Sequence, residues 1–359
     1  MSKNNVSMYD VAVIGCGVAG CFVSKLLSEK GLKVIAIEEH PTPGKPNKCT
    51  GLVSWRIKNL VDLDESLIQN TVRRAEFISP KGEKLELKSK KPVIVIDRKK
   101  LDYKLYKESL EAGTEIKTKE RFIDFKYVDN GVEIITNKGK YFSKILVGAD
   151  GAFSRVAATA GLKQPSNIFY GLQATVKGNY EKDKVELWFG KKIAPEFFGW
   201  VVPISPNKAK VGIASKKKPL KYFNFFLKKR CRSKAKPDTA GIIRFGLMKK
   251  TVGNRLLLVG DAAAQVKPFS GGGIVYSLIA SRIAVLTIRK AINQENYSEE
   301  FFMKNYDKLW KEKLAAGIKK GMFIRKVLYL LGDTSVNFWI NFGKLVKFEI
   351  EKWDMDLIE

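Results

Sequence analysis

The chain of 359 residues is long enough to bury a large core, and we expect two closely joined domains. Lys and Arg number 65 against 37 Asp and Glu, and the net charge of +28 indicates an anionic partner. No apolar run reaches the roughly 18 residues that span a bilayer, and the polar Met1–Met8 lacks a signal-peptide apolar region, so we expect a cytoplasmic protein. Four cysteines without metal-ligand spacing predict free thiols and no metal site, and the single histidine argues against histidine-based catalysis.

Residues 9–38 predict a dinucleotide-binding strand–helix–strand unit. The β-branched run Val11–Ile14 is typical of a buried parallel strand. Three glycines follow it in G-x-G-x-x-G spacing: Gly15, Gly17 and Gly20. They allow a tight turn, the approach of a pyrophosphate and close packing of the next helix, which we expect over about 19–30. Glu38 ends the second strand, where an acidic side chain binds ribose hydroxyls.

Further strands and one long helix are predicted between residues 40 and 151. Pro and Gly break regular structure in 40–51, and a helical segment is expected to follow to about Asp62. Alternation in Ala75–Leu87 predicts two edge strands around a turn at 80–82. Asp97 is the predicted N-cap of a helix over Arg98–Ala112. The other strands are expected at 93–96, 115–117, 121–128, 132–136 and 145–148, the last of them leading into Asp150-Gly151.

The second half of the chain changes from strands to helices. Four antiparallel strands are expected at 169–176, 184–189, 198–204 and 208–214, followed by a basic aromatic segment at 216–230. A buried strand, Leu256–Gly260, then carries Asp261 at its carboxyl end. A glycine-rich loop opens a helix expected from Ile274 to about Lys290, whose N-terminus can hold negative charge. The remainder is predicted to be mostly helical.

Four sites together resemble flavoproteins of the glutathione-reductase-like class that includes p-hydroxybenzoate hydroxylase: the glycines of 15–20, Glu38, Asp150-Gly151 and Gly260-Asp261. The resemblance implies FAD as cofactor, bound by the glycine turn with Ala19. It places Glu38 at the adenosine ribose and Asp261 at the ribitol–pyrophosphate region. It also places Gly273 and Ile274 at the isoalloxazine edge, with Arg98 contacting the flavin.

Two further segments are similar to geranylgeranyl reductases, which saturate isoprenoid double bonds in archaeal membrane lipids or in the chlorophyll side chain. Residues 46–51 match the P-x-x-C-x-G pattern, and 194–203 look like an aromatic-x-Trp-x-x-Pro strand, with Lys210-Val-Gly resembling the Asn-Val-Gly run that follows it. The archaeal digeranylgeranylglycerophospholipid reductases are the relatives implied. Thr50, Glu196, Phe197 and Lys267 depart from the family's usual residues.

This resemblance implies reduction of an isoprenoid double bond by hydride from reduced flavin plus a proton. Cys49 is the predicted proton donor, and Cys49, Thr50 and Gly51 are expected beside the flavin; the alternative for Cys49 is a small buried hydrophobe. Phe189, Phe198 and Trp200 would line an isoprenoid channel or belong to a plain core. The electron donor would be NAD(P)H or ferredoxin.

The implied fold is α/β (α+β overall): a Rossmann-type FAD-binding domain, an inserted antiparallel β-sheet substrate domain and a helical C-terminal part. The FAD-binding domain is expected at 1–70, 97–165 and 240–300. The substrate domain is expected at 71–96 and 166–239, and the helical region at 301–359.

Two other functions remain open from the sequence. One is a flavin-dependent monooxygenase or halogenase on the same fold, and the other is a non-catalytic, basic lipid-binding flavoprotein. No nucleic-acid motif is present. Basic residues beside aromatic ones in Lys216–Lys236 and Met322–Trp353 predict peripheral binding to an anionic membrane surface, at the inner membrane face. The alternative, favoured for the C-terminal segment, is that the apolar residues pack on the sheet and the lysines are solvated.

Overall fold

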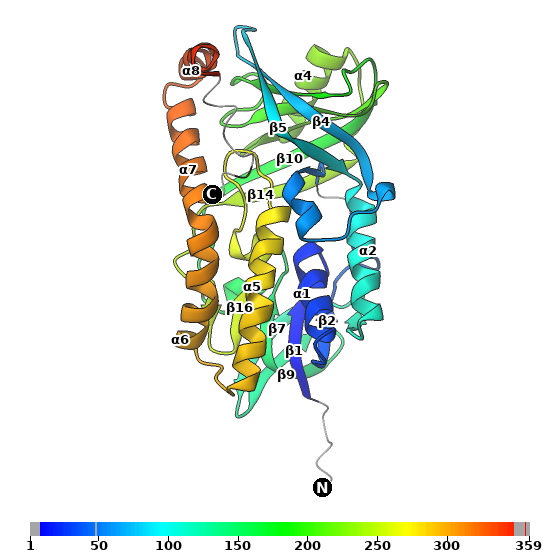
Figure 1. The fold of residues 1–359 in the computed structure, drawn as a ribbon, viewed down its shortest axis with the longest axis vertical. Coiled ribbons are helices and arrows are strands. Elements are labelled where there is room, and N and C mark those ends of the chain that lie inside the picture. The colour runs from blue at the N-terminus through cyan, green and yellow to red at the C-terminus, as the bar shows by residue number, and fades with distance from the viewer. Residues whose placement is uncertain (1–7, 47–48, 348–355, 357–359) are drawn as a thin grey trace.

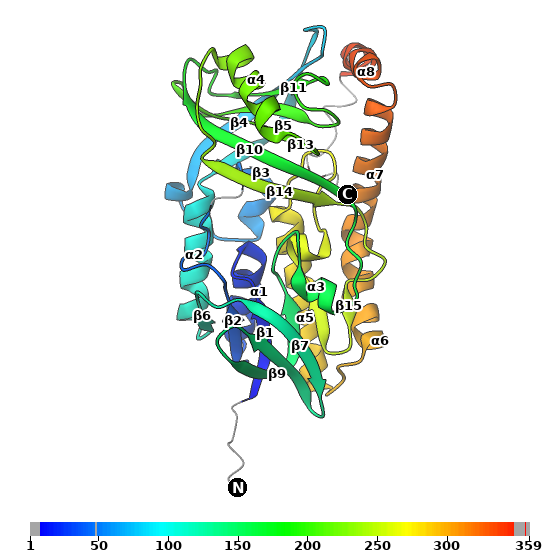
Figure 2. The ribbon, with the colours of Figure 1, turned by 180° about the vertical axis from the view of Figure 1, so that it is seen from behind.

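The computed structural model describes residues 8–46, 49–347 and 356. Two eight-stranded sheets lie one above the other, and the long helix α7 (Lys308–Tyr329) runs beside both (Figures 1 and 2). Trp310, Leu314 and Ile318 of α7 are buried in the core of the lower half, whereas Leu328 belongs to the core of the upper half. This helix therefore ties the two halves together.

The first sheet is the predicted dinucleotide-binding sheet, and β1 lies between β2 and β9 in it. Both pairings are parallel, as is the pairing of β9 with β16. The helices α1 (Val18–Ser28), α2 (Arg98–Glu111) and α5 (Ile274–Asn293) pack together beside this sheet. The strands are β1 (Met8–Ile14), β2 (Val34–Ile37), β6 (Glu115–Lys117), β7 (Phe122–Val128), β8 (Gly131–Thr136), β9 (Lys140–Gly148), β15 (Val252–Gly253) and β16 (Leu256–Leu258).

The second sheet runs in the order β14-β10-β13-β12-β11-β4-β5-β3, and all its pairings are antiparallel except that of β4 with β11. Its strands are β3 (Leu52–Ser54), β4 (Ile68–Ile78), β5 (Lys84–Ile96), β10 (Asn167–Lys177), β11 (Lys184–Phe189), β12 (Phe198–Ser205), β13 (Lys208–Ser215) and β14 (Thr239–Phe245). The sheet thus includes β3, the start of β4 and all of β14 after Thr239, which lie outside the expected 71–96 and 166–239. The domain bounds themselves stay a prediction.

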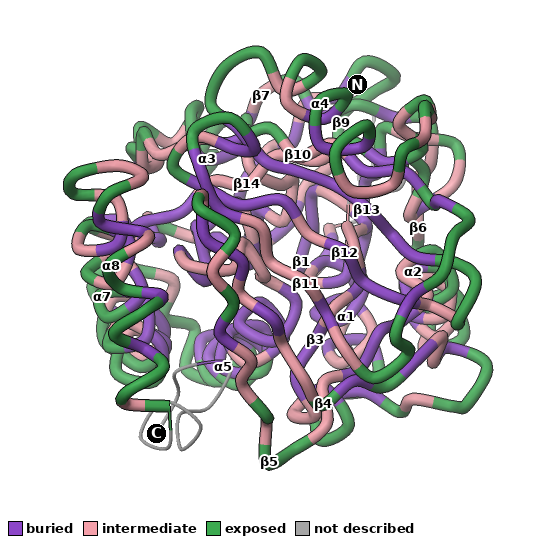
Figure 3. Tube along the Cα trace, turned by 90° about the horizontal axis from the view of Figure 1, so that it is seen from above, coloured by how far each residue is buried: buried purple, intermediate pink, exposed green. Residues whose placement is uncertain are grey.

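Shorter elements complete the fold. The remaining α-helices are α3 (Arg155–Thr159), α4 (Pro219–Cys231), α6 (Glu299–Phe302) and α8 (Asp333–Leu345). Of these, α4 packs on β13 and β10. Three 3₁₀ turns cover Trp55–Asn59, Glu65–Leu67 and Gly260–Ala263, and a π-helical turn covers Met303–Asp307. Seen from above, the buried residues gather along the strands and the inner faces of the helices (Figure 3).

Most predicted elements are confirmed, including the Asp97 cap, whose carboxylate accepts hydrogen bonds from the backbone N–H groups of Lys99 and Lys100. One expectation was wrong and another was half right. Residues 52–59 form a short strand and a 3₁₀ turn instead of a longer helical segment, because Leu52–Ser54 pairs with β5. Of the hairpin at 75–87, Ala75–Ile78 lies inside the sheet between β5 and β11, whereas Lys84–Leu87 lies at an edge, because β3 pairs only with Val93–Val95 of β5.

Candidate active site

The glycines after β1 shape an open space at the start of α1. Gly15 has φ +97°, and a Cβ there would lie 2.6 Å from the carbonyl oxygen of Ala149. A Cβ at Gly20 would lie 1.9 Å from the carbonyl oxygen of Gly15, so only glycine lets α1 approach β1. Gly17 is the N-cap of α1, has no side-chain cap, and its Cβ position meets no atom within 4 Å. The first N–H groups of α1 therefore face space suited to a phosphate.

Glu38 and Asp261 supply carboxylates on either side of this helix start. Glu38 is buried, and its carboxylate accepts hydrogen bonds from the backbone N–H groups of Cys16 at 2.8 Å and His40 at 2.9 Å. A Cβ on Gly260 would lie 3.0 Å from the Cβ of Ala19, and a Cβ on Gly273 would lie 2.9 Å from Asp261 Oδ1. Asp261 thus lies between α1 and the start of α5.

These residues fit FAD. The uncapped start of α1 suits the pyrophosphate, the two carboxylates suit ribose and ribityl hydroxyls, and Gly273 with Ile274 begins α5 beside Asp261. The contacts of each residue with the cofactor stay a prediction. Within residues 8–46, 49–347 and 356, no cluster of three or more His, Cys, Asp or Glu side chains could hold a metal ion.

Cys49 lies in a loop held against β5. Its sulfur accepts a hydrogen bond from the backbone N–H of Gly51 at 3.3 Å, and its side chain is also hydrogen-bonded to Arg98. Gly51 has φ +80°, and a Cβ there would lie 2.3 Å from the carbonyl oxygen of Ile96. Glycine is therefore required two positions after the cysteine. Of the P-x-x-C-x-G motif, Asn47 and Lys48 lie outside the described residues.

Arg98 begins α2 and brings a fixed positive charge to this loop. Its guanidinium lies 3.0 Å from the Asp102 carboxylate. Burial lowers the pKa of Arg98, but Asp102 and Cys49 raise it by more, so the pKa lies above its ordinary value. The guanidinium therefore stays charged beside the thiol.

Two residues that the sequence reasoning missed hold the Cys49 loop in place. Lys210 is only 6% exposed, and its ammonium donates hydrogen bonds to the carbonyl oxygens of Thr50 at 2.6 Å and Ile96 at 3.3 Å. Burial lowers the pKa of Lys210. The buried Gln173 accepts hydrogen bonds through Oε1 from Thr50 Oγ1 at 2.7 Å and Trp200 Nε1 at 3.0 Å. The departure of Lys210-Val-Gly from the Asn-Val-Gly pattern that it resembles was a usable signal for Lys210; nothing in the sequence marks Gln173.

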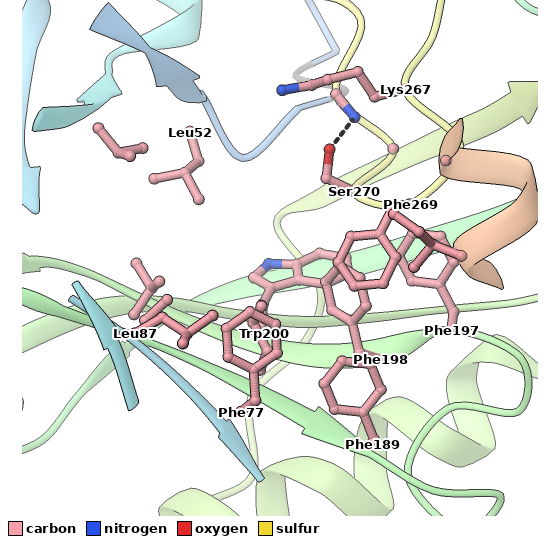
Figure 4. A pocket seen from close by; sticks show the side chains of 18 of the residues that line it. Leu52, Phe77, Leu87, Phe189, Phe197, Phe198, Trp200, Lys267, Phe269 and Ser270 are labelled. Atoms are coloured by element: carbon pink, nitrogen blue, oxygen red, sulfur yellow. Dashed lines mark hydrogen bonds between the residues drawn. The ribbon is translucent and has the colours of Figure 1, made fainter. Parts of the chain in front are cut away.

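A pocket of about 840 Å³, which we call the central pocket, begins at Cys49, Thr50 and Gly51. Its walls are the second sheet, residues 267–272 before α5, and parts of α7 and α8. Phe189, Phe198 and Trp200 all line it, and their rings form a chain in which Phe198 lies 5.6 Å from Phe189 and 6.4 Å from Trp200 (Figure 4). The lining is mostly apolar, as expected of a site for an apolar ligand.

The outer end of the central pocket is formed by aromatic side chains of α7 and α8. Phe323, Trp339 and Phe342 line the pocket and are 66%, 38% and 41% exposed. The pocket thus connects the molecular surface with the Cys49 loop. The cofactor residues of 15–38 lie in the other half of the molecule, and residues 267–274 connect the two groups.

Comparison with known proteins identifies the family. Residues 8–189 match the family described as an FAD binding domain. Digeranylgeranylglycerophospholipid reductase 1 of Methanococcoides burtonii is 32% identical, with 98% of this chain and 90% of that protein covered. The reductase of the same name from Methanosarcina acetivorans is 31% identical, with 95% and 90% covered.

The solved structures agree in fold. A geranylgeranyl bacteriochlorophyll reductase-like protein from Thermoplasma acidophilum superposes with a TM-score of 0.86 at 24% identity, covering 94% of this chain and 92% of that one. A halogenase, PltM, in complex with FAD superposes with a TM-score of 0.71 at 14% identity, covering 98% and 87%. The predicted fold class and the FAD cofactor are confirmed. The chain belongs to the digeranylgeranylglycerophospholipid reductase family of FAD-dependent oxidoreductases.

Proposed function

We propose that this enzyme saturates geranylgeranyl double bonds of a membrane lipid precursor. The observation that carries the proposal is the central pocket, an apolar, aromatic-lined space that reaches from exposed residues of α7 and α8 to Cys49. The named relatives are reductases of such lipids. An isoprenoid chain is long, flexible and apolar, and this lining matches it along its length.

Bound FAD, once reduced, supplies the hydride for one carbon of the double bond. The residues of this chain supply the rest. The pocket excludes water and holds the chain against the Cys49 loop, and the Cys49 thiol gives its proton to the second carbon. Arg98, hydrogen-bonded to Cys49, and the buried Lys210 stabilise the thiolate that remains, because a nearby cation favours that form.

The electrons that reduce the flavin come, in this proposal, from NAD(P)H or ferredoxin. Reduction of the purified flavoprotein by each donor under anaerobic conditions, followed by flavin absorbance, compares the two directly.

We also propose that α7 and α8 dock on an anionic membrane surface. Large apolar side chains are exposed at the C-terminal end of α7, in the turn that follows it and on α8, and they form what we call the α7–α8 apolar surface: Phe323, Leu330, Leu331, Phe338, Trp339, Phe342 and Leu345. Exposed lysines, among them Lys326 and Lys344, accompany them. Apolar side chains next to lysines suit the boundary between headgroups and acyl chains. A lipid could then pass from the membrane into the pocket at its outer end.

Two segments were expected to bind a membrane surface through basic and aromatic residues. The expectation for the aromatic residues of 216–236 was partly wrong, and the segment 322–353 extends beyond the described residues. Phe223, Phe226 and Leu227 are buried in the core of the second sheet, so α4 exposes Leu220 and Phe225 beside its lysines but not these three side chains. Phe348, Lys352 and Trp353 lie outside the described residues. Within the described residues, no helix is long and apolar enough to cross a bilayer.

Anaerobic reoxidation tests the proposed reaction. The purified protein is photoreduced, mixed with a geranylgeranyl lipid, and followed by flavin absorbance and product mass. The proposal requires reoxidation accompanied by a saturated product. A flavin that is reoxidised only by oxygen, with hydroxylation or halogenation of an aromatic substrate, would replace it with the monooxygenase or halogenase function.

A further inference from the structure

A buried carboxylate lies next to the central pocket and is held by residues that no part of the proposed reaction uses. Asp356, near the C-terminal end of the chain, is 0% exposed. Its carboxylate accepts hydrogen bonds from Lys267 Nζ at 2.7 Å and from the hydroxyl of Ser54. Arg56 Nε lies 3.8 Å from the same carboxylate, at ion-pair distance. The hydroxyl of Tyr276 donates a hydrogen bond to the Asp356 backbone carbonyl oxygen.

The groups that hold this carboxylate come from two separate parts of the chain. Ser54 ends β3, Arg56 follows in the 3₁₀ turn, and Lys267 precedes the glycine-rich loop of α5. Lys267 and Tyr276 also line the central pocket, and Figure 4 shows Lys267 across the pocket from the aromatic cluster. Lys267 and Tyr276 therefore connect the pocket wall with the buried carboxylate behind it, and the Lys267–Asp356 ion pair is not a surface one.

The charges explain why an anion must occupy this position. Lys267 is only 7% exposed, and Arg56 adds a second cation nearby. A buried cation without an anionic partner is strongly destabilising, so the site demands a negative charge at all times. A phosphate could take the place of this carboxylate, because its oxygens accept hydrogen bonds from arginine, lysine and hydroxyl groups in the same way.

We propose that Lys267, Arg56 and Ser54, together the anion subsite, bind the phosphate of the isoprenoid substrate, and that the Asp356 carboxylate holds this position until the substrate displaces it. The inference rests on the proposed function, because it assigns the headgroup end of the same lipid. The phosphate can belong to a glycerophospholipid or to a prenyl diphosphate. With the phosphate at Lys267, the isoprenoid chain extends into the aromatic pocket, so its first double bonds lie nearest the glycine-rich loop.

The test compares a digeranylgeranylglycerol phosphate with the same diether lacking phosphate, and adds geranylgeranyl diphosphate to separate the two phosphate sources. For the wild-type enzyme we expect a KM at least about tenfold lower for a phosphorylated lipid than for the unphosphorylated diether, in line with one or two charge-assisted hydrogen bonds. In Lys267→Met, the KM for the phosphorylated lipid should rise to that for the unphosphorylated diether. Lys308→Met, at an exposed lysine of α7, serves as the matched control and should leave the ratio unchanged.

A second variant tests whether the substrate phosphate displaces the Asp356 carboxylate or whether this carboxylate has only a structural role. Asp356→Asn should lower the KM for phosphorylated lipids several-fold, because the phosphate no longer competes with a carboxylate. Should Lys267→Met fail to fold, the double variant Lys267→Met/Asp356→Leu removes both charges, and its bound FAD and Tm report the fold.

The outcomes distinguish the two proposals. Reduction of none of the three lipids overturns the proposed function. Reduction of all three with equal KM values, or a KM for phosphorylated lipid that rises in Asp356→Asn, overturns the anion subsite alone.

Discussion

The ammonium of Lys210 donates a 2.6 Å hydrogen bond to the carbonyl oxygen of Thr50, the residue that follows Cys49. A buried cation on β13 thereby fastens the cysteine loop to the second sheet. The same ammonium reaches the carbonyl oxygen of Ile96 at the end of β5. Loop, sheet and the start of α2 therefore share one buried donor.

Replacing Lys210 by Met should loosen the Cys49 loop without loss of FAD. Both carbonyl oxygens lose their donor, so we expect reoxidation of reduced flavin by lipid to slow at least about tenfold, as a small misplacement of reacting groups predicts. Single-turnover absorbance measures this rate. Equal rates for Lys210→Met and wild type, with equal FAD content, would show that Lys210 has no positioning role.

The lowered pKa of Lys210 also predicts a pH dependence of stability. Burial lowers this pKa in the folded state below the ordinary 10.5, so the unfolded chain binds more protons between the two values. The free energy of unfolding of the wild type, measured relative to Lys210→Met, should therefore rise as the pH increases through this window toward 10.5. Urea unfolding of both proteins across alkaline pH measures it. A difference that falls with pH would contradict the assignment.

Replacing Cys49 by Ala should preserve FAD and slow alkene reduction. A general acid contributes about 10² to 10⁴ in rate, so we expect a loss in that range if Cys49 gives the proton. Single turnovers with pre-reduced flavin isolate this step, and Cys49→Ser is the matched control because a hydroxyl keeps a donor in place. Unchanged reoxidation in Cys49→Ala would return this residue to a packing role.

Replacing Asp261 by Ala should weaken retention of FAD, which we expect to bind non-covalently in a near 1:1 ratio. The carboxylate lies beside Gly273 at the start of α5, where it can accept hydrogen bonds from ribityl hydroxyls. Glu312→Ala, at an exposed position of α7, is the control. FAD content after gel filtration decides the matter, and equal retention by both variants would refute this role for Asp261.

Substitutions on α8 should separate membrane docking from catalysis. Changing Phe338 and Leu345 to Ser should reduce co-sedimentation with anionic vesicles, because these apolar side chains are exposed on α8. Binding should also weaken as salt rises, since screening shortens the electrostatic field. Neutral replacements of Lys217, Lys218, Lys228 and Lys229 test α4 and the lysines before it separately. Lys216 and Arg230 are left intact, because they pair with Glu196 and Glu186. Equal co-sedimentation with anionic and neutral vesicles would show that the net positive charge does not serve membrane binding.

Regular elements with strong local signals could be predicted from the sequence. Gly15 and Gly20 require glycine for close backbone approach, and Asp97 caps α2 as its sequence context indicates. The four strands expected within 168–215 are confirmed as β10 to β13. Leu52–Ser54 was misjudged because a three-residue strand depends on its partner β5, not on its own pattern.

The site was predictable only where a motif carries it. Cys49 and Trp200 came from family patterns, and both line the central pocket. Gln173 contacts Thr50, which lies more than a hundred positions away in the sequence. Asp356 contacts Lys267, which lies about ninety positions away. Such pairings follow from tertiary packing, and no local pattern contains them.

The account is tested most directly by the stoichiometry of one anaerobic turnover. The photoreduced enzyme is mixed with an excess of digeranylgeranyl lipid, and flavin absorbance is compared with the amount of saturated product measured by mass spectrometry. The proposed reaction requires one double bond to be lost for each reduced FAD that is reoxidised, with slower reoxidation in Cys49→Ala. A reduced flavin that stays reduced with every geranylgeranyl lipid offered, yet reoxidises rapidly in air, would contradict it.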